Sequence, residues 1–246
     1  MLTPNRKPFV ATALAGSEIL VIANAAGDDL ESGTDSSVAL PAFTRDEVEA
    51  VYHWVHDGGR LLLIADHAPF GAAAGTLAAR FGVHMSGGYT IDSSQAVPGE
   101  GNPGILEFAR DRGSLGDHVI LRGRDPSERV TRVIAFTGQS LLGPGGSAPL
   151  LNLCPASRDI PFSTFAQRQD FDALLRQATP AGGRSMGVAL QIGRGRVVAL
   201  GEAAMLSARV VSRPGAEPRK IGMNRPGTDN QQLALNVIRW LAGALN

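Results

Sequence analysis

The sequence predicts an α/β fold with a mostly parallel central sheet, and two apolar runs are the main evidence. Ile19–Ala23 and Leu61–Ala65 are short and continuously hydrophobic, as strands buried on both faces are. A helical pattern lies between them, and a helix of small residues from about Gly71 to Phe81 follows the second run. The order strand, helix, strand, helix is typical of parallel strands joined by right-handed crossovers.

The first helix has a clear signal at each end. Thr44 and Glu47 have the spacing of a capping box, in which each side chain satisfies a free backbone N–H at the helix start. Gly58-Gly59 is predicted to end the helix, because glycine readily adopts the left-handed conformation found at the C-terminal end of helices. The residues with the spacing of one buried helical face are Val48, Val51, Tyr52 and Val55.

The second half of the chain adds further strands and a final helix. Its predicted strands are Val130–Phe136, Pro149–Leu153 and a hairpin of Gly187–Ile192 with Arg196–Leu200. Phe162–Gln177 is predicted as a loop or an insertion near the sheet edge, and Val83 to about Arg129 is Gly-rich and weakly periodic.

The last helix is predicted to begin near Thr228 or Asp229, with Thr228 and Gln231 as a second capping box. Its predicted buried face consists of Ala234, Val237, Ile238 and Leu241. The sequence shows no repeat, low-complexity tract or linker. We therefore predict one domain over residues 1–246.

Composition narrows the class of protein. The 246 residues are 43% hydrophobic and 19% charged, which is typical of a globular chain. Lys+Arg and Asp+Glu both number 23, so the formal net charge is zero. That balance disfavours nucleic acid or an anionic membrane as a partner, and it favours self-association into a homo-oligomer. The other predicted partner is a small-molecule substrate.

Two further features bear on location and redox chemistry. No apolar run approaches the roughly 20 residues that span a bilayer, and the first residues lack the apolar core of a signal peptide, so a cytoplasmic location is predicted. Cys154 is the single cysteine, which excludes a disulfide within the chain. Because Pro155 follows it, we predict a buried or half-buried side chain rather than a nucleophile.

Polar residues follow the predicted strands, where open parallel sheets bind their ligands. The candidates are Asn24 with Asp28 and Asp29, Asp66 with His67, Thr137 with Gln139 and Ser140, Glu202, and Asn224 just before the last helix. The pair Asp66-His67 is the best of these, because a carboxylate and an imidazole together can transfer protons or bind a metal. The alternative is that Asp66 caps the next helix while His67 packs against the turn.

Metal binding is an alternative use of the same residues. Asp66, His67 and Glu202, with Asp28 or Asp29, could supply ligands to a divalent ion, and no other cofactor is predicted. The sequence contains neither a His-Glu-x-x-His motif nor a Gly-x-Ser-x-Gly nucleophile elbow. No Gly-x-Gly-x-x-Gly follows an early strand, so nucleotide binding is disfavoured.

Four stretches carry a family resemblance: Thr3–Phe9, Leu61–Phe70, Gly201–Met205 and Asp229–Gly243. Together they resemble the class I glutamine amidotransferase-like (GATase1-like) superfamily, in an uncharacterised bacterial branch related to the domain of unknown function 4350. The resemblance implies a flavodoxin-like three-layer sandwich. It also implies a missing strand–helix unit ahead of Thr3, and an exported location as the alternative, because longer relatives can carry export signals.

The resemblance also bears on chemistry. Amidotransferases carry a cysteine at the elbow after the strand that Leu61–Ala65 resembles, and a His-x-Glu after a later strand. This chain has Asp66-His67 at the elbow and Glu202 near the later position. Glutamine hydrolysis by a cysteine triad is therefore not expected.

Two functions follow as hypotheses. The first is a hydrolase of a small ester or amide, in which Asp66 and His67 are acid/base or metal-binding groups and Glu202 orients His67 or completes a metal site. Asn24, Gln139 and Asn224 would bind the substrate. The second is a non-catalytic domain that binds a ligand such as a carbohydrate, or a partner, along the same edge.

Overall fold

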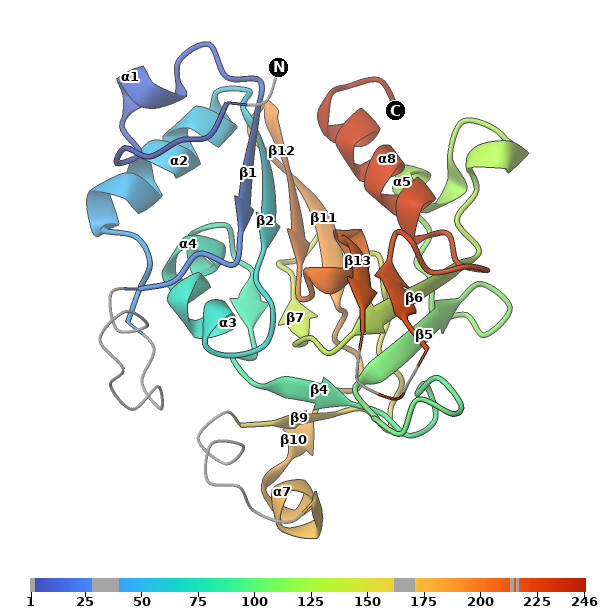
Figure 1. Ribbon diagram of the computed structural model, residues 1–246. Coiled ribbons are helices and arrows are strands. Elements are labelled where there is room, and N and C mark those ends of the chain that lie inside the picture. The colour runs from blue at the N-terminus through green and yellow to red at the C-terminus, as the bar shows by residue number, and fades with distance from the viewer. Residues whose placement is uncertain (1–2, 28–39, 162–170, 213–214, 216) are drawn as a thin grey trace.

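The computed structural model describes residues 3–27, 40–161, 171–212, 215 and 217–246 (Figure 1). Its α-helices are α1 (Ala11–Leu14), α2 (Arg45–His56), α3 (Phe70–Ala73), α4 (Gly75–Arg80), α5 (Val119–Arg122), α7 (Phe171–Gln177) and α8 (Asn230–Leu241). Two short 3₁₀ helices are η2 (Pro126–Glu128) and η3 (Ala204–Leu206).

The strands are distributed over the whole chain. They are β1 (Ile19–Ala23), β2 (Arg60–Ile64), β3 (His84–Met85), β4 (Tyr89–Ile91), β5 (Ile105–Ala109), β6 (Arg132–Phe136), β7 (Leu141–Leu142), β8 (Ala148–Pro149), β9 (Arg158–Ile160), β10 (Thr179–Pro180), β11 (Gly187–Ile192), β12 (Gly195–Leu200), β13 (Ala208–Val211) and β14 (Arg219–Gly222).

The central sheet has the strand order β1-β2-β12-β11-β8. β1, β2 and β12 run parallel, with Val21 and Val198 both opposite Leu62. β11 pairs antiparallel with β12, and β8 pairs antiparallel with β11. The sheet is therefore only partly parallel.

The prediction of a flavodoxin-like three-layer sandwich with a mostly parallel central sheet is wrong. β11 and β12 form a hairpin that turns at Gly193, and a turn this tight reverses the chain, whereas a parallel pair needs a long crossover. The other described strands form small antiparallel sheets, which are β10-β9-β4, β13-β14, β3-β7 and β5-β6. The fold is a mixed α/β architecture around one partly parallel sheet.

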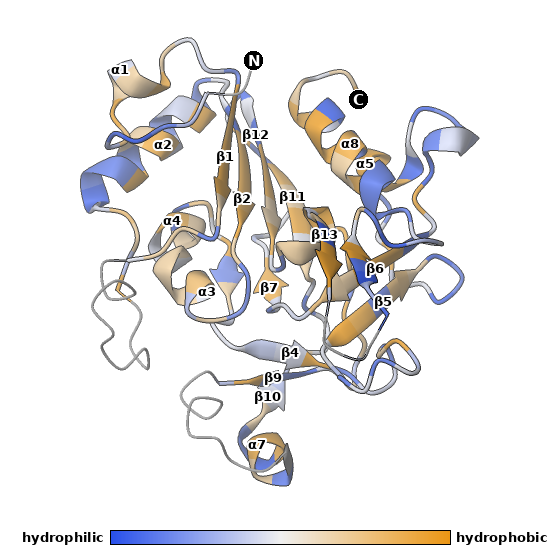
Figure 2. Ribbon diagram, viewed as in Figure 1, coloured by the Kyte–Doolittle hydropathy of each residue, from blue (hydrophilic) through white to orange (hydrophobic). Residues whose placement is uncertain are grey.

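Helices α2 and α8 pack against opposite faces of this sheet (Figure 1). Alternate residues of β2 point to the two sides, so Leu61 and Leu63 join the core under α2, while Leu62 and Ile64 join the core under α8. The central strands accordingly form the most continuous hydrophobic region in Figure 2. Two apolar layers thus fix the position at which β2 ends.

The capping box of the first predicted helix is confirmed. The Thr44 side chain accepts the Glu47 N–H, and the Glu47 carboxylate accepts the Thr44 N–H. Gly71–Phe81 forms two short helices, α3 and α4, rather than one.

The last helix differs from its prediction in two details. It begins at Asn230, and Thr228 donates to the carbonyl of Arg225 rather than forming a capping box. Ile238 is 41% exposed, because α8 turns Leu233, Val237 and Trp240 toward the sheet.

The middle of the chain is more regular than its sequence indicates. The Gly-rich stretch from Val83 to Arg129 contains β3, β4, β5, α5 and η2. The predicted strand Pro149–Leu153 is reduced to β8 with isolated bridges at Leu151 and Asn152. Of the predicted loop 162–177, residues 171–177 are helix α7 and residues 162–170 lie outside the described residues. Among the described helices, none is long and apolar enough to cross a membrane.

Candidate functional site

The turn after β2 is held from one side by Asn24, at the end of β1. The side-chain oxygen of Asn24 accepts the backbone N–H of Asp66 at 2.9 Å. The backbone N–H of Asn24 donates to the carbonyl of Ile64 at 2.9 Å. Asn24 therefore lies beside Asp66, as the sequence predicts, but its oxygen positions the turn.

Gln139 holds the same turn from a second side. Its side-chain nitrogen donates to the carbonyls of Ala65 and Asp66, at 2.8 and 2.9 Å, and its oxygen accepts the N–H of Gly87 at 2.8 Å. The side chain is fully buried. A Cβ atom on Gly71 would collide with the Gln139 amide, so glycine is required there. Gln139 is thus a structural brace for the Asp66-His67 turn.

Glu202 is the second carboxylate of the site and has no exposed surface. It follows β12 and accepts the backbone N–H groups of Ala204 and Met205, at 2.6 and 2.7 Å. A third backbone hydrogen bond comes from Phe136 of β6. Burial, followed by the charge of Asp66, raises the pKa of Glu202 to about 8.

Asp66 lies beside Glu202 and is partly exposed. Its carboxylate accepts the N–H of His67 at 2.8 Å, and that of Ala203. The two carboxylates therefore bind three consecutive N–H groups, those of Ala203, Ala204 and Met205. Burial raises the pKa of Asp66, although the neighbouring His67 and both backbone hydrogen bonds oppose the rise.

We call these two residues the Asp66–Glu202 pair. Within the described part of the chain, no Lys or Arg forms an ion pair with either carboxylate. Two adjacent carboxylates without a cation resist simultaneous ionisation. The pair therefore retains a proton near neutral pH, which the ion-paired carboxylates of the chain do not.

His67 is half-buried next to the pair. Its Nδ1 lies 2.9 Å from the carbonyl oxygen of Ala68. Because a carbonyl can only accept, Nδ1 carries the hydrogen in this contact and Nε2 is left as an acceptor. The orientation of His67 comes from the Ala68 carbonyl and not from Glu202, whose described partners are backbone groups and Asp66.

Tyr89 is a site residue that sequence reasoning missed. Its ring centroid lies 5.6 Å from that of His67, and its hydroxyl donates to the side-chain oxygen of Asn102 at 3.1 Å. Burial raises the pKa of Tyr89, and the charge of Asp66 adds to the rise. Tyr89 stands in the Gly-rich middle of the chain, where neither hydropathy periodicity nor a motif singles it out.

Two strained residues lie at the same edge of the fold. Asn24 and Thr137 have φ angles of 50° and 81°, and they are the described non-glycine residues with positive φ. Thr137 directly follows β6 and precedes Gly138, where any Cβ atom would approach the Cβ of Glu202 to 2.7 Å. A β-branched residue in this conformation costs about 1–3 kcal/mol, and such strain gathers at functional sites.

The described residues do not provide a complete set of ligands for the predicted metal site. Asp28 and Asp29 lie outside the described residues. Among the residues that are described, no three His, Cys, Asp or Glu side chains are arranged to hold one ion. Asp66, His67 and Glu202 are thus neighbours without forming a three-ligand metal centre by themselves.

The remaining polar candidates lie elsewhere or serve other partners. Asn224 is exposed in the connection between β14 and α8. Ser140 is fully buried and donates to Asp159 while accepting from Arg184. Cys154 is half-buried with a free thiol, as predicted.

Comparisons with known proteins address the fold and not the chemistry. No protein-family profile and no curated protein sequence matches the chain. A solved structure titled mmIFT52 N-terminal domain superimposes with a TM-score of 0.60 at 12% identity, covering 96% of this chain and 82% of that one. At that identity the likeness shows a shared fold alone.

Two structures from Salmonella typhimurium also match, with lower scores. Cytoplasmic Protein STM1381 from strain LT2 has a TM-score of 0.42 at 14% identity, covering 96% of this chain and 74% of its own. Cytoplasmic Protein STM3548 has a TM-score of 0.47 at 12% identity, covering 96% and 76%.

The expected label of a flavodoxin-like protein is wrong, and the labels hydrolase and esterase are withdrawn, because none of these matching structures is titled as either. The fold that the chain shares is that of the IFT52 N-terminal domain, and the sheet that defines it is only partly parallel.

Proposed function

We propose that the chain binds a small polar molecule at the Asp66-His67 turn and exchanges a proton with it. One observation carries the proposal. A partly exposed carboxyl, Asp66, lies beside a fully buried carboxyl, Glu202, and no described Lys or Arg forms an ion pair with either. A carboxyl that keeps its proton at neutral pH can donate it as a general acid.

The residues would divide the work as follows. Asp66 is the accessible member of the pair and contacts the ligand. Glu202 has no exposed surface, so it is a positioning residue that shares the proton with Asp66. His67 offers Nε2 as a proton acceptor, because Nδ1 is engaged by Ala68. Tyr89 forms the wall behind His67.

A small-molecule partner is consistent with the charge of the chain. The formal net charge is zero, so no strong overall field favours nucleic acid or an anionic membrane. The cytoplasm remains the proposed location on sequence grounds, and a divalent ion at Asp66 remains an alternative ligand of the same carboxylate.

A second candidate is a non-catalytic binding domain. It is favoured by the three backbone hydrogen bonds of Glu202, which give this residue a structural role in joining β12, η3 and β6. In that case Asp66 would recognise a ligand, and no proton transfer would follow.

The experiment is a ligand-observed NMR screen of small polar compounds, including esters and amides, at one pH below and one above the Glu202 pKa of about 8. The test variants are Asp66→Asn and His67→Ala. Their matched controls are Asp111→Asn and His53→Ala, at exposed positions. Titrations with Mg²⁺ and Zn²⁺ test whether a divalent ion binds at Asp66 instead.

We expect at least one of the screened compounds to bind the wild-type protein and both control variants but not Asp66→Asn. We also expect the wild-type protein to convert that compound and His67→Ala to leave it unconverted. Binding without turnover by the wild-type protein would select the non-catalytic candidate. Binding and turnover that both survive in Asp66→Asn and His67→Ala would contradict the proposal.

A further inference from the structure

Strand β1 lies at one edge of the central sheet and, among the strands that the structure describes, pairs with β2 alone. The Asn24 N–H bonds to Ile64, so the alternation of a parallel ladder turns the even-numbered residues of β1 toward β2. Ile19, Val21 and Ala23 then direct their N–H and C=O groups away from the sheet. No described residue accepts or donates a hydrogen bond at these three positions. Within the described part of the chain, β1 is thus an open edge.

This edge lacks the usual protection against pairing. Monomeric proteins place Lys, Pro, bulges or very short strands at exposed edges. The sequence of β1 is Ile-Leu-Val-Ile-Ala, with no charge and no proline. The opposite edge does carry such protection, because β8 is two residues long and ends in Pro149.

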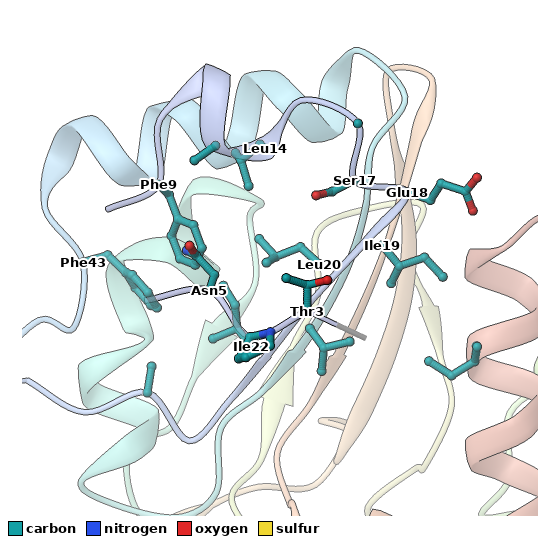
Figure 3. Close-up of a pocket in the computed structure, with 16 residues that line it drawn as sticks. Thr3, Asn5, Phe9, Leu14, Ser17, Glu18, Ile19, Leu20, Ile22 and Phe43 are labelled. Atoms are coloured by element: carbon teal, nitrogen blue, oxygen red, sulfur yellow. The ribbon is translucent and has the colours of Figure 1, made fainter. Parts of the chain in front are cut away.

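The surface beside the edge carries exposed apolar side chains. Val21 is 46% exposed, and Ile238 of helix α8, which lines the same groove, is 41% exposed. A groove of about 980 Å³ runs along β1, and Glu18 is the ionisable residue in its lining (Figure 3). Thr3 and Asn5 lie near Leu20 and Ile22 in this groove, but the described residues 3–9 form no strand with β1.

The edge is complementary to itself. The outward-facing residues are spaced symmetrically about Val21, so an antiparallel copy can place Val21 opposite Val21 and Ile19 opposite Ala23. Each such opposition is a hydrogen-bonded pair that satisfies two N–H and two C=O groups. The two Glu18 side chains then lie at opposite ends of the ladder, and a formal net charge of zero gives no overall repulsion.

We propose that β1 pairs antiparallel with β1 of a second copy of this chain, about a two-fold axis at Val21, and so joins two central sheets into one. Such isologous contacts are the commonest way in which subunits associate. A five-residue ladder with a small apolar rim belongs to the low end of interface sizes. The dimer is therefore expected to form with increasing protein concentration.

The test is the molar mass of the full chain over a concentration series, by sedimentation or light scattering. The wild-type mass should rise from 25.7 kDa toward twice that value. Val21→Lys places two like charges opposite each other, and Ala23→Pro removes one outward N–H without touching the bonds to β2, so both variants should stay monomeric. Val210→Lys, at a valine of β13 that is 55% exposed, is the matched control and should dimerise.

Amide exchange locates the contact independently of the variants. The Val21 N–H of the wild-type protein should be protected at high concentration and unprotected at low concentration. A wild-type mass that stays at the monomer value at every concentration would overturn the proposal. So would dimers that persist in both folded variants, or an unprotected Val21 amide in the dimer.

Discussion

At the residue scale, the site depends on a few side chains that bind backbone groups. Asn24 and Gln139 fix the turn that carries Asp66, and Glu202 binds three backbone N–H groups from two elements. These three residues were candidates in the sequence because each is polar and follows a predicted strand. Their partners could not be predicted, because β6, β12 and η3 come together only in the folded chain.

Thr137 provides a test of strain at this edge. Thr137→Gly should raise the free energy of unfolding by about 1 kcal/mol, because glycine adopts a φ of 81° without the steric cost that threonine meets. Urea unfolding measures the change. Thr179→Gly, at an exposed threonine of β10 without positive φ, should instead lose stability. Equal losses in the two variants would contradict the strain argument.

At the scale of the elements, short-range sequence patterns identify single helices and strands better than they identify which strands pair with each other. The capping box of α2 and the hairpin of β11 with β12 follow from local spacing, and both are present. The prediction of a mostly parallel sheet was wrong, because β11 and β8 both pair antiparallel in it. Strand pairing is decided by contacts distant in sequence, and an apolar run gives no direction.

The edge of β6 shows how side chains can replace a strand. Asp229 accepts the N–H groups of Thr131 and Arg132, and Asn230 accepts that of Ile134. Glu202 accepts the N–H of Phe136, further along the same edge. These bonds attach the β5–β6 ribbon to the site, so the position of Glu202 depends on them.

Asn230→Ala tests this attachment. The substitution leaves the buried N–H and C=O of Ile134 and the C=O of Met205 without their partner, and should cost about 3 kcal/mol or more. Thermal and urea unfolding measure the loss. Gln231→Ala, on the exposed side of the same helix, should change the free energy of unfolding by less than about 0.5 kcal/mol. A small effect of Asn230→Ala would show that the ribbon is held by other contacts.

At the scale of the whole molecule, two apolar layers fix the end of β2, and the Asp66–Glu202 pair lies at that end with Glu202 fully buried. That the chain mixes helices and strands was predictable from the two apolar runs and the helical pattern between them. The partly parallel sheet and the small antiparallel sheets were not, because a resemblance in short stretches does not determine how the intervening strands pair. Tyr89 was missed because neither hydropathy periodicity nor a motif singles it out in the Gly-rich middle of the chain.

Burial of Glu202 in this pair makes the stability of the whole fold depend on pH. The pKa of Glu202 is about 8 in the folded chain and 4.5 ordinarily, so the folded state binds more protons than the unfolded state between these values. Stability contributed by the proton is fully present below about pH 4.5 and is lost as the pH rises toward about 8. The slope for one proton is at most about 1.4 kcal/mol per pH unit.

The most direct test of the central claim, that folding keeps a proton on the Asp66–Glu202 pair, is the free energy of unfolding as a function of pH. We expect it to fall across this window in the wild-type protein, and to fall less steeply in Glu202→Gln and in Asp66→Asn. Glu217→Gln, at an exposed glutamate, should keep the wild-type slope. Identical slopes in the wild-type protein and both pair variants would contradict the claim.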